Sequence, residues 1–218
     1  MIYAGWKSLL DPQIDLQLVE LSGRGKRIHE PSYLNMEEAV DDLFSHVCNN
    51  LNPPYAFFGH SMGSLISYEL TQLIVRKGFP PPMHVFFSGR GAPNVQLDDE
   101  PAFHLMDDRQ FSEELVKLGG TPPEFFSHPE LAEVFVPILK NDFRIVETYE
   151  GTETINPLNM EISVFLGKQD DQSAEQCDAW RNHSTELCRL YYFNGGHFFF
   201  NENSGQIIRI INSTLLQA

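Results

Sequence analysis

The chain has 218 residues, 42% of them hydrophobic, which is typical of one compact soluble domain. Its formal net charge of −15 disfavours nucleic acids and anionic membranes as partners, because both would repel it. No apolar stretch reaches the length of a membrane span, and the first residues lack the regions of a signal peptide, so we expect a cytoplasmic protein. Cys48, Cys177 and Cys188 are odd in number and lack metal-ligand spacing, which predicts reduced thiols and no metal site.

Strand and helix patterns alternate along most of the chain. This alternation predicts an α/β fold, with a mostly parallel sheet flanked by helices, and residues 1–218 are expected to form a single domain. In the first part of the chain we expect a strand at 16–21, a helix at 36–48, and strands at 55–58 and 83–88.

The strand at 55–58 leads into Gly59-His60-Ser61-Met62-Gly63, and a helical pattern follows. Gly-x-Ser-x-Gly between a strand and a helix is typical of a serine nucleophile held on a strained turn. We expect both glycines to be needed on steric grounds. The motif makes Ser61 the candidate nucleophile of a serine hydrolase, with a base and a carboxylate following later in the chain.

Residues 107–149 show no strand pattern. Instead, apolar residues at helical spacing predict short helices around 111–118 and 131–138, separated by Gly119-Gly120-Thr121-Pro122-Pro123. An insertion at this point would lie over the carboxyl edge of the sheet, where ligands bind. We expect a helical lid, and the alternative is that these helices only pack against the domain.

Two later strand patterns end in polar residues suited to assist the serine. The strand at 160–166 precedes Gly167-Lys168-Gln169-Asp170-Asp171, and the Gly-x-x-Asp spacing favours Asp170 over its neighbour Asp171 as the acid. The strand at 190–193 precedes Gly195-Gly196-His197, where two glycines allow a turn that aims the imidazole over the sheet edge, so His197 is the candidate base. The other seven histidines lack this pattern, and His60 is expected to pack or bond locally.

Taken together, these motifs and several others resemble the type II thioesterases, the stand-alone editing hydrolases of nonribosomal peptide and polyketide synthesis. The resemblance covers nearly the whole chain and is carried by Gly23-Arg24-Gly25, Arg27, Glu30-Pro31, residues 58–63, Ser88-Gly89-Arg90, Ala92-Pro93, residues 118–122, Asp142-Phe143, Glu147-Thr148-Tyr149, residues 167–170, Asp178-Ala179-Trp180 and residues 195–198.

The resemblance implies an α/β-hydrolase fold and a Ser-His-Asp triad of Ser61, His197 and Asp170. It also implies a monomer without a cofactor that cleaves acyl groups from the phosphopantetheine arm of acyl or peptidyl carrier proteins. Arg24, Lys26 and Arg27 are candidates for a basic patch that docks such carriers, and a solvated loop is an equally good interpretation.

The chain departs from the family at its start, because relatives begin with a strand and a Pro-aromatic-Ala-Gly-Gly loop. Without gaps, Tyr3–Leu10 matches the helix that follows that loop, so we expect the first strand to be missing. In the alternative, gapped alignment, Tyr3-Ala4-Gly5 would stand in for the loop, but the helix would then be too short. An oxyanion hole uses two backbone N–H donors, here Met62 and one from the upstream loop, and losing one lowers the rate about a hundredfold. A catalytically weakened form that binds carriers or synthases, and a generic carboxylesterase, are therefore the alternative functions.

Overall fold

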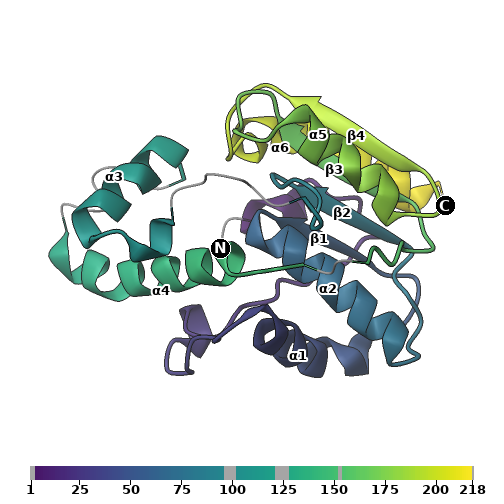
Figure 1. The fold of residues 1–218 in the computed structure, drawn as a ribbon. Helices are drawn as coiled ribbons and strands as arrows, with labels where there is room; N and C mark the ends of the chain where they lie inside the picture. The colour runs from purple at the N-terminus through teal and green to yellow at the C-terminus, as the bar shows by residue number, and fades with distance from the viewer. Residues whose placement is uncertain (1–2, 96–101, 121–127, 152–153, 218) are drawn as a thin grey trace.

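The computed structural model describes residues 3–95, 102–120, 128–151 and 154–217, and its centre is a parallel sheet (Figure 1). The strands are β1 (Ala56–His60), β2 (His84–Ser88), β3 (Ile162–Gly167) and β4 (Cys188–Phe193), hydrogen-bonded in that order. All three pairings are parallel. The carboxyl ends of the four strands therefore share one edge of the sheet.

Helices cover both faces of this sheet (Figure 1). The α-helices are α1 (Met36–Val47), α2 (Met62–Arg76), α3 (Asp108–Leu118), α4 (Pro129–Glu147), α5 (Ala174–Asp178) and α6 (Phe200–Leu216). Short 3-10 helices span Ala4–Ser8, Gly25–Arg27, Cys48–Asn50, Phe103–Leu105 and Ala179–His183. Within the described ranges, no helix combines the length and apolar character needed to cross a bilayer.

The inner strands β2 and β3 are buried on both faces, as expected of a parallel sheet covered by helices. Alternate residues point to opposite sides, so Val85 and Phe87 pack in the cluster that contains Tyr68 of α2 and Trp180, whose ring stacks 4.1 Å from that of Phe87. Phe86 lies on the other side, in the cluster formed with α6 and with Trp6 near the N-terminus. Fully buried aromatic rings on both faces hold the sheet in place.

Most expected elements are confirmed with boundaries shifted by one or two residues. The strands expected at 55–58, 83–88, 160–166 and 190–193 are β1 to β4, and the helix expected at 36–48 is α1. The helix at Tyr3–Leu10 is a 3-10 helix, Ala4–Ser8, whose Trp6 ring packs 4.8 Å from Phe58.

The strand expected at 16–21 is wrong, because no strand forms there. β1 is the edge of the sheet, and its outer side pairs with no described strand. Segment 16–21 does not pair with this edge, although its leucines at 16 and 21 still pack on the core clusters. Leu18 and Val19 remain 36% and 53% exposed, which is unusual for apolar side chains in a strand-like pattern.

The insertion between β2 and β3 is helical, as expected, and α3 and α4 extend to one side of the sheet (Figure 1). A capping box of Asp107 and Gln110 starts α3, and Gly119 with φ 85° ends it. α4 is longer than the pattern around 131–138 indicates, because Pro129 begins it and Pro137 is accommodated inside it. Of the expected break between the two helices, Thr121, Pro122 and Pro123 lie outside the described residues.

Candidate active site

Ser61 occupies the turn between β1 and α2, with φ 54° and ψ −118°. It is the non-glycine residue with positive φ in the described part of the chain, a conformation that costs about 1–3 kcal/mol unless its surroundings enforce it. Backbone bonds enforce it here, since the Ser61 N–H donates to the Ser88 carbonyl at 2.8 Å and the Ser61 carbonyl accepts from the Ser64 N–H at 2.9 Å. The predicted serine is therefore mounted on a strained turn.

The two glycines of the motif play different parts. A Cβ at Gly59 would lie 2.0 Å from the carbonyl oxygen of Gly63, so no side chain fits at Gly59. A Cβ at Gly63 would meet nothing within 4 Å. The prediction that a side chain would collide is therefore confirmed at Gly59 and wrong at Gly63. The backbone of Gly63 takes part in the close contact, but a side chain on Gly63 would not.

Further support for the turn comes from residues that the sequence patterns did not indicate. The Ser64 hydroxyl is 2.9 Å from the carbonyl oxygens of both Gly59 and Ser88, and it accepts from the Ser88 N–H at 2.9 Å. Ser64 thus joins the carboxyl ends of β1 and β2. A single buried serine in the first turn of a helix carries no sequence signal that would reveal this role.

Asp170 and His197 face each other across the loops that follow β3 and β4. His197 Nδ1 lies 3.1 Å from Asp170 Oδ2 and 3.3 Å from Oδ1. Since an ionised carboxylate only accepts, Nδ1 carries the proton and Nε2 is left as the basic nitrogen. The Asp170 side chain is 8% exposed and that of His197 is 18% exposed, so the pair is largely shielded from water.

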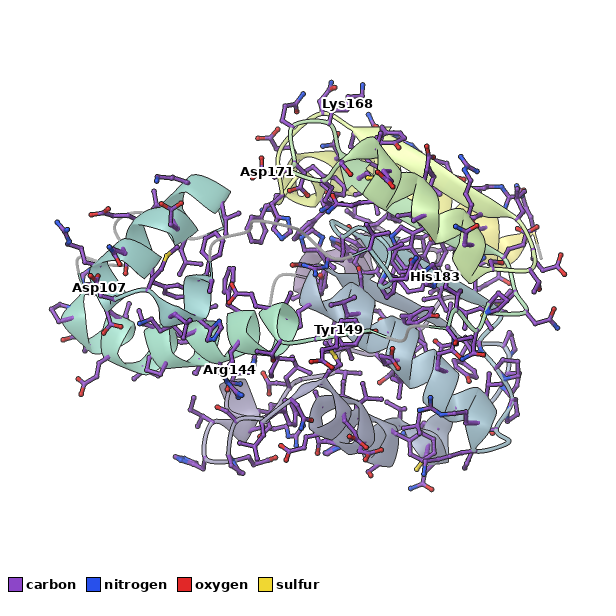
Figure 2. The ribbon with its side chains drawn as sticks, in the orientation of Figure 1. Asp107, Arg144, Tyr149, Lys168, Asp171 and His183 are labelled. Carbon is purple, nitrogen blue, oxygen red and sulfur yellow. The ribbon has the colours of Figure 1, made fainter. Side chains whose placement is uncertain are left out.

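Asp171 does not contact the imidazole. Its side chain is exposed, and Figure 2 shows it on the loop after β3, near Lys168. Its backbone N–H donates to Asp170 Oδ1 at 3.1 Å. The geometry therefore favours Asp170 as the partner of His197, and Asp171 helps to hold it.

The two loops are bonded to one another, which fixes the separation of Asp170 and His197. The Lys168 N–H donates to the Phe193 carbonyl at 2.9 Å, and the Gln169 N–H donates to the Gly195 carbonyl at 3.0 Å. The Gln169 side chain in turn accepts from the Gly195 N–H. A Cβ at Gly167 would lie 2.5 Å from the Gly196 oxygen, so glycine at the end of β3 permits this close approach.

His60 lies beside His197, with 5.0 Å between the ring centroids. Its Nδ1 is 2.9 Å from the Ser88 hydroxyl oxygen, as expected of a locally bonded residue. Burial, and then the neighbouring His197, hold the pKa of His60 well below its ordinary value, so it is neutral. Because His60 precedes Ser61, this contact brings the base close to the serine. Ser61 and His197 share no hydrogen bond among those of the described residues, and such bonds often tighten only when substrate binds.

Met62 is the first residue of α2, so its N–H has no intrahelical acceptor. The N-terminus of a 15-residue helix also carries a partial positive charge, which favours a developing oxyanion. This position suits the expected oxyanion donor.

A cavity of about 320 Å³ opens beside His197. The C-terminal turn of α3 (117–119) lines one side of it, and the loop 195–199 with the first turn of α6 lines the other. The next residue, Gly120, approaches so closely that a Cβ there would lie 2.2 Å from the Phe198 ring. The insertion therefore borders the space next to the candidate base.

Two of the three cations of the expected basic patch form ion pairs within the chain. Arg24 forms a bidentate ion pair with Asp142 of α4 at 2.7 and 2.8 Å. Arg27 pairs with Asp42 at 2.8 Å and also with Glu30. Of the three cations, Lys26 alone forms no ion pair with the described residues, so Arg24 and Arg27 are anchors of the fold and not free docking groups.

The three cysteines are unpaired, and Cys177 and Cys188 are buried. Among the described residues, no group of three or more histidine, cysteine or acidic side chains is arranged to hold a metal ion. The arrangement at the sheet edge instead suits acyl transfer, with a serine, an imidazole and a carboxylate brought to the ends of β1, β4 and β3.

Comparisons with known proteins agree with this geometry. The family model of the thioesterase domain matches residues 1–215. Linear gramicidin dehydrogenase LgrE of Brevibacillus parabrevis is 37% identical over 98% of this chain and 82% of its own length, and gramicidin S biosynthesis protein GrsT of Aneurinibacillus migulanus is 32% identical over 94% and 80%.

Solved structures of similar fold cover almost the whole chain. ClbQ from the colibactin NRPS/PKS pathway has a TM-score of 0.92 and 35% identity, covering 99% of this chain and 91% of that one. The type II thioesterase BorB from the borrelidin biosynthetic cluster has a TM-score of 0.87 and 29% identity, covering 97% and 85%. The chain therefore belongs to the thioesterase family of the α/β-hydrolase fold, and its similarity lies with the type II thioesterases of nonribosomal peptide and polyketide pathways.

Proposed function

We propose that this chain is a cytoplasmic, monomeric type II thioesterase that removes acyl groups from the phosphopantetheine arm of acyl or peptidyl carrier proteins. The observation that carries the proposal is the hydrogen-bonded Asp170–His197 pair beside the strained Ser61 turn. The similarity to BorB, which is named as a type II thioesterase, supports the choice of substrate class.

In the proposed mechanism, Ser61 Oγ attacks the thioester carbonyl carbon while its proton passes to His197 Nε2. Asp170 holds the imidazole in the required tautomer and stabilises the imidazolium. The Met62 N–H stabilises the oxyanion, which collapses to an acyl-serine as His197 protonates the leaving sulfur. Water then attacks the acyl-serine, His197 takes its proton and returns it to Ser61 Oγ, and a carboxylic acid is released.

The cavity between α3 and the loop 195–199 gives the proposed lid its role. A long, narrow arm could reach His197 beside residues 117–119, with Gly120 against Phe198 limiting the width. The relative LgrE is named a dehydrogenase. The sequence of this chain, however, has no Gly-x-Gly-x-x-Gly loop of the kind that binds dinucleotides after a strand.

Substrate preference tests the proposal against a generic carboxylesterase. We expect acyl groups on a phosphopantetheine arm to be hydrolysed faster than the same groups as simple oxygen esters, because the cavity borders a lid and suits a long arm. Comparison of kcat/KM for matched thioester and oxygen-ester substrates measures this preference. A strong preference for water-insoluble triglycerides would contradict the proposal and favour a lipase.

Ser61→Ala should abolish covalent labelling by a fluorophosphonate and acyl-enzyme formation, because the variant has no nucleophilic oxygen. Its melting temperature should stay close to that of the parent, since alanine fits the same turn and the backbone bonds to Ser88 and Ser64 remain. Mass spectrometry of the labelled protein and a thermal melt measure the two effects. Labelling at the parent rate would show that another residue is the nucleophile.

Asp170→Asn should lower turnover on the order of ten-thousandfold, because the amide no longer fixes the imidazole tautomer or stabilises its charge. Asp171→Asn should change turnover only a few-fold, since it keeps the backbone N–H that contacts Asp170. His197→Ala should be as severe as Ser61→Ala. A larger loss for Asp171→Asn, measured as kcat on one thioester, would mean that the acid is assigned to the wrong neighbour.

The unpaired outer side of β1 leads to a further test. A version extended ahead of Tyr3 by a strand and a Pro-aromatic-Ala-Gly-Gly loop should turn over thioesters about a hundredfold faster, the effect of one oxyanion donor. Its melting temperature should also rise, because a strand beside β1 adds ladder bonds and covers apolar surface.

The two proteins are to be compared as folded monomers at equal concentration. Equal activity of both forms would show that the described chain already supplies a second donor. That result would contradict the alternative that this chain is a catalytically weakened protein that only binds carriers.

A further inference from the structure

Gln172 contacts the carboxylate of Asp170 on the same oxygen that faces His197. Its Nε2 donates to Asp170 Oδ2 at 2.9 Å, and His197 Nδ1 lies 3.1 Å from that atom. With the Asp171 N–H on Oδ1, the carboxylate receives three donors. We propose that Gln172 is a positioning residue that holds Asp170 in the orientation its imidazole partner needs. The inference rests on the proposed serine mechanism but not on the identity of the acyl substrate.

The orientation of the Gln172 amide is determined by chemistry. A carboxylate oxygen repels another acceptor, so the NH₂ group and not the carbonyl must face Asp170. The Oε1 atom is consequently left buried, and no group of the described residues donates a hydrogen bond to it. An unsatisfied buried acceptor destabilises a fold, so stability alone gives no reason for an amide at this position. A methionine of similar length would fill the space without that penalty.

A neutral donor is well suited to this carboxylate. The described contacts of Asp170 include no lysine or arginine, so its negative charge remains available to stabilise an imidazolium. The Cys177 thiol stays neutral, because burial, and then the charges of Asp170 and Asp178, raise its pKa to about 11. Gln172 therefore fixes the carboxylate in place without neutralising it.

Burial makes this donor difficult to replace. The Asp170 side chain is 8% exposed, so little water can take the place of the amide if it is removed. The Asp170 N–H donates to the Gly167 carbonyl at 3.2 Å, and this bond does not fix the rotation of the carboxylate. The Asp171 N–H holds only Oδ1, so the side-chain donors Gln172 and His197 decide where Oδ2 lies.

The test uses Gln172→Met, which removes the donor and the unpartnered oxygen while keeping the length. We expect fluorophosphonate labelling of Ser61 and kcat to fall about threefold to tenfold, the effect of losing one hydrogen bond, with KM unchanged. The melting temperature should stay equal or rise. Gln172→Glu, close in shape, should be at least as slow above pH 7, because an ionised carboxyl cannot donate and repels Asp170.

A spectroscopic readout separates positioning from a structural role. The imidazole Nδ1–H resonance of His197, assigned by its loss in His197→Ala, should be weaker and exchange faster in Gln172→Met, because the carboxylate is less fixed. Glu175→Gln, an exposed change on α5, is the matched control and should leave labelling and the resonance unchanged.

The possible results separate the role of Gln172 from the proposed thioesterase function. Parent-like labelling and resonance in Gln172→Met would overturn the role of Gln172 while leaving the serine mechanism in place. A lower melting temperature with an unchanged resonance would also overturn it, in favour of a structural role. The expected losses in a protein that hydrolyses no carrier thioester would support the role of Gln172 and contradict the proposed substrate. A parent that is not labelled at all would overturn both.

Discussion

The candidate site depends on how closely the loops after neighbouring parallel strands approach one another. Asp170 and His197 meet because the loops after β3 and β4 exchange backbone bonds, and that exchange is possible because Gly167 has no side chain to strike the Gly196 carbonyl. A close backbone approach also depends on glycine within the turn after β1, where Gly59 leaves room for the backbone of Gly63 beneath Ser61. Parallel pairing brings the strand ends to one edge, and two glycines let the reactive groups come within reach there.

The sequence predicted those features of the site that depend on residues adjacent in the chain. Buried strands with turns after them placed Ser61, Asp170 and His197 at the correct edge of the sheet, because each motif follows its own strand directly. The strand at 16–21 was predicted by the same reasoning and does not form. A strand needs a partner as well as a pattern, and pairing is a non-local property that Leu18 and Val19 cannot reveal from their own spacing.

Contacts between residues far apart in the chain, or between residues that belong to no motif, could not be predicted from the sequence, because they too depend on the fold. The Gly-x-x-Asp spacing favours Asp170 over the adjacent Asp171 but does not show where either side chain points, whereas the fold turns the Asp170 carboxylate inward and leaves that of Asp171 exposed. Gln172 and Ser64 carry no motif, yet each bonds to a residue of the site. The sequence also suggested that Arg24 was available to a partner, and a pairing 118 residues away with Asp142 shows that it anchors α4.

These anchors constrain how the insertion can move. The C-terminal half of α4 is held to the segment before α1, because Arg24 binds Asp142 and Arg144 donates to the carbonyls of Tyr33 and Leu34 (Figure 2). By contrast, the end of α3 approaches the body at Gly120 and Phe198, a contact of apolar surfaces. Apolar contacts are non-directional and separate more readily than bidentate ion pairs. The insertion is therefore held by ion pairs at α4 and by apolar contact at the end of α3, beside His197.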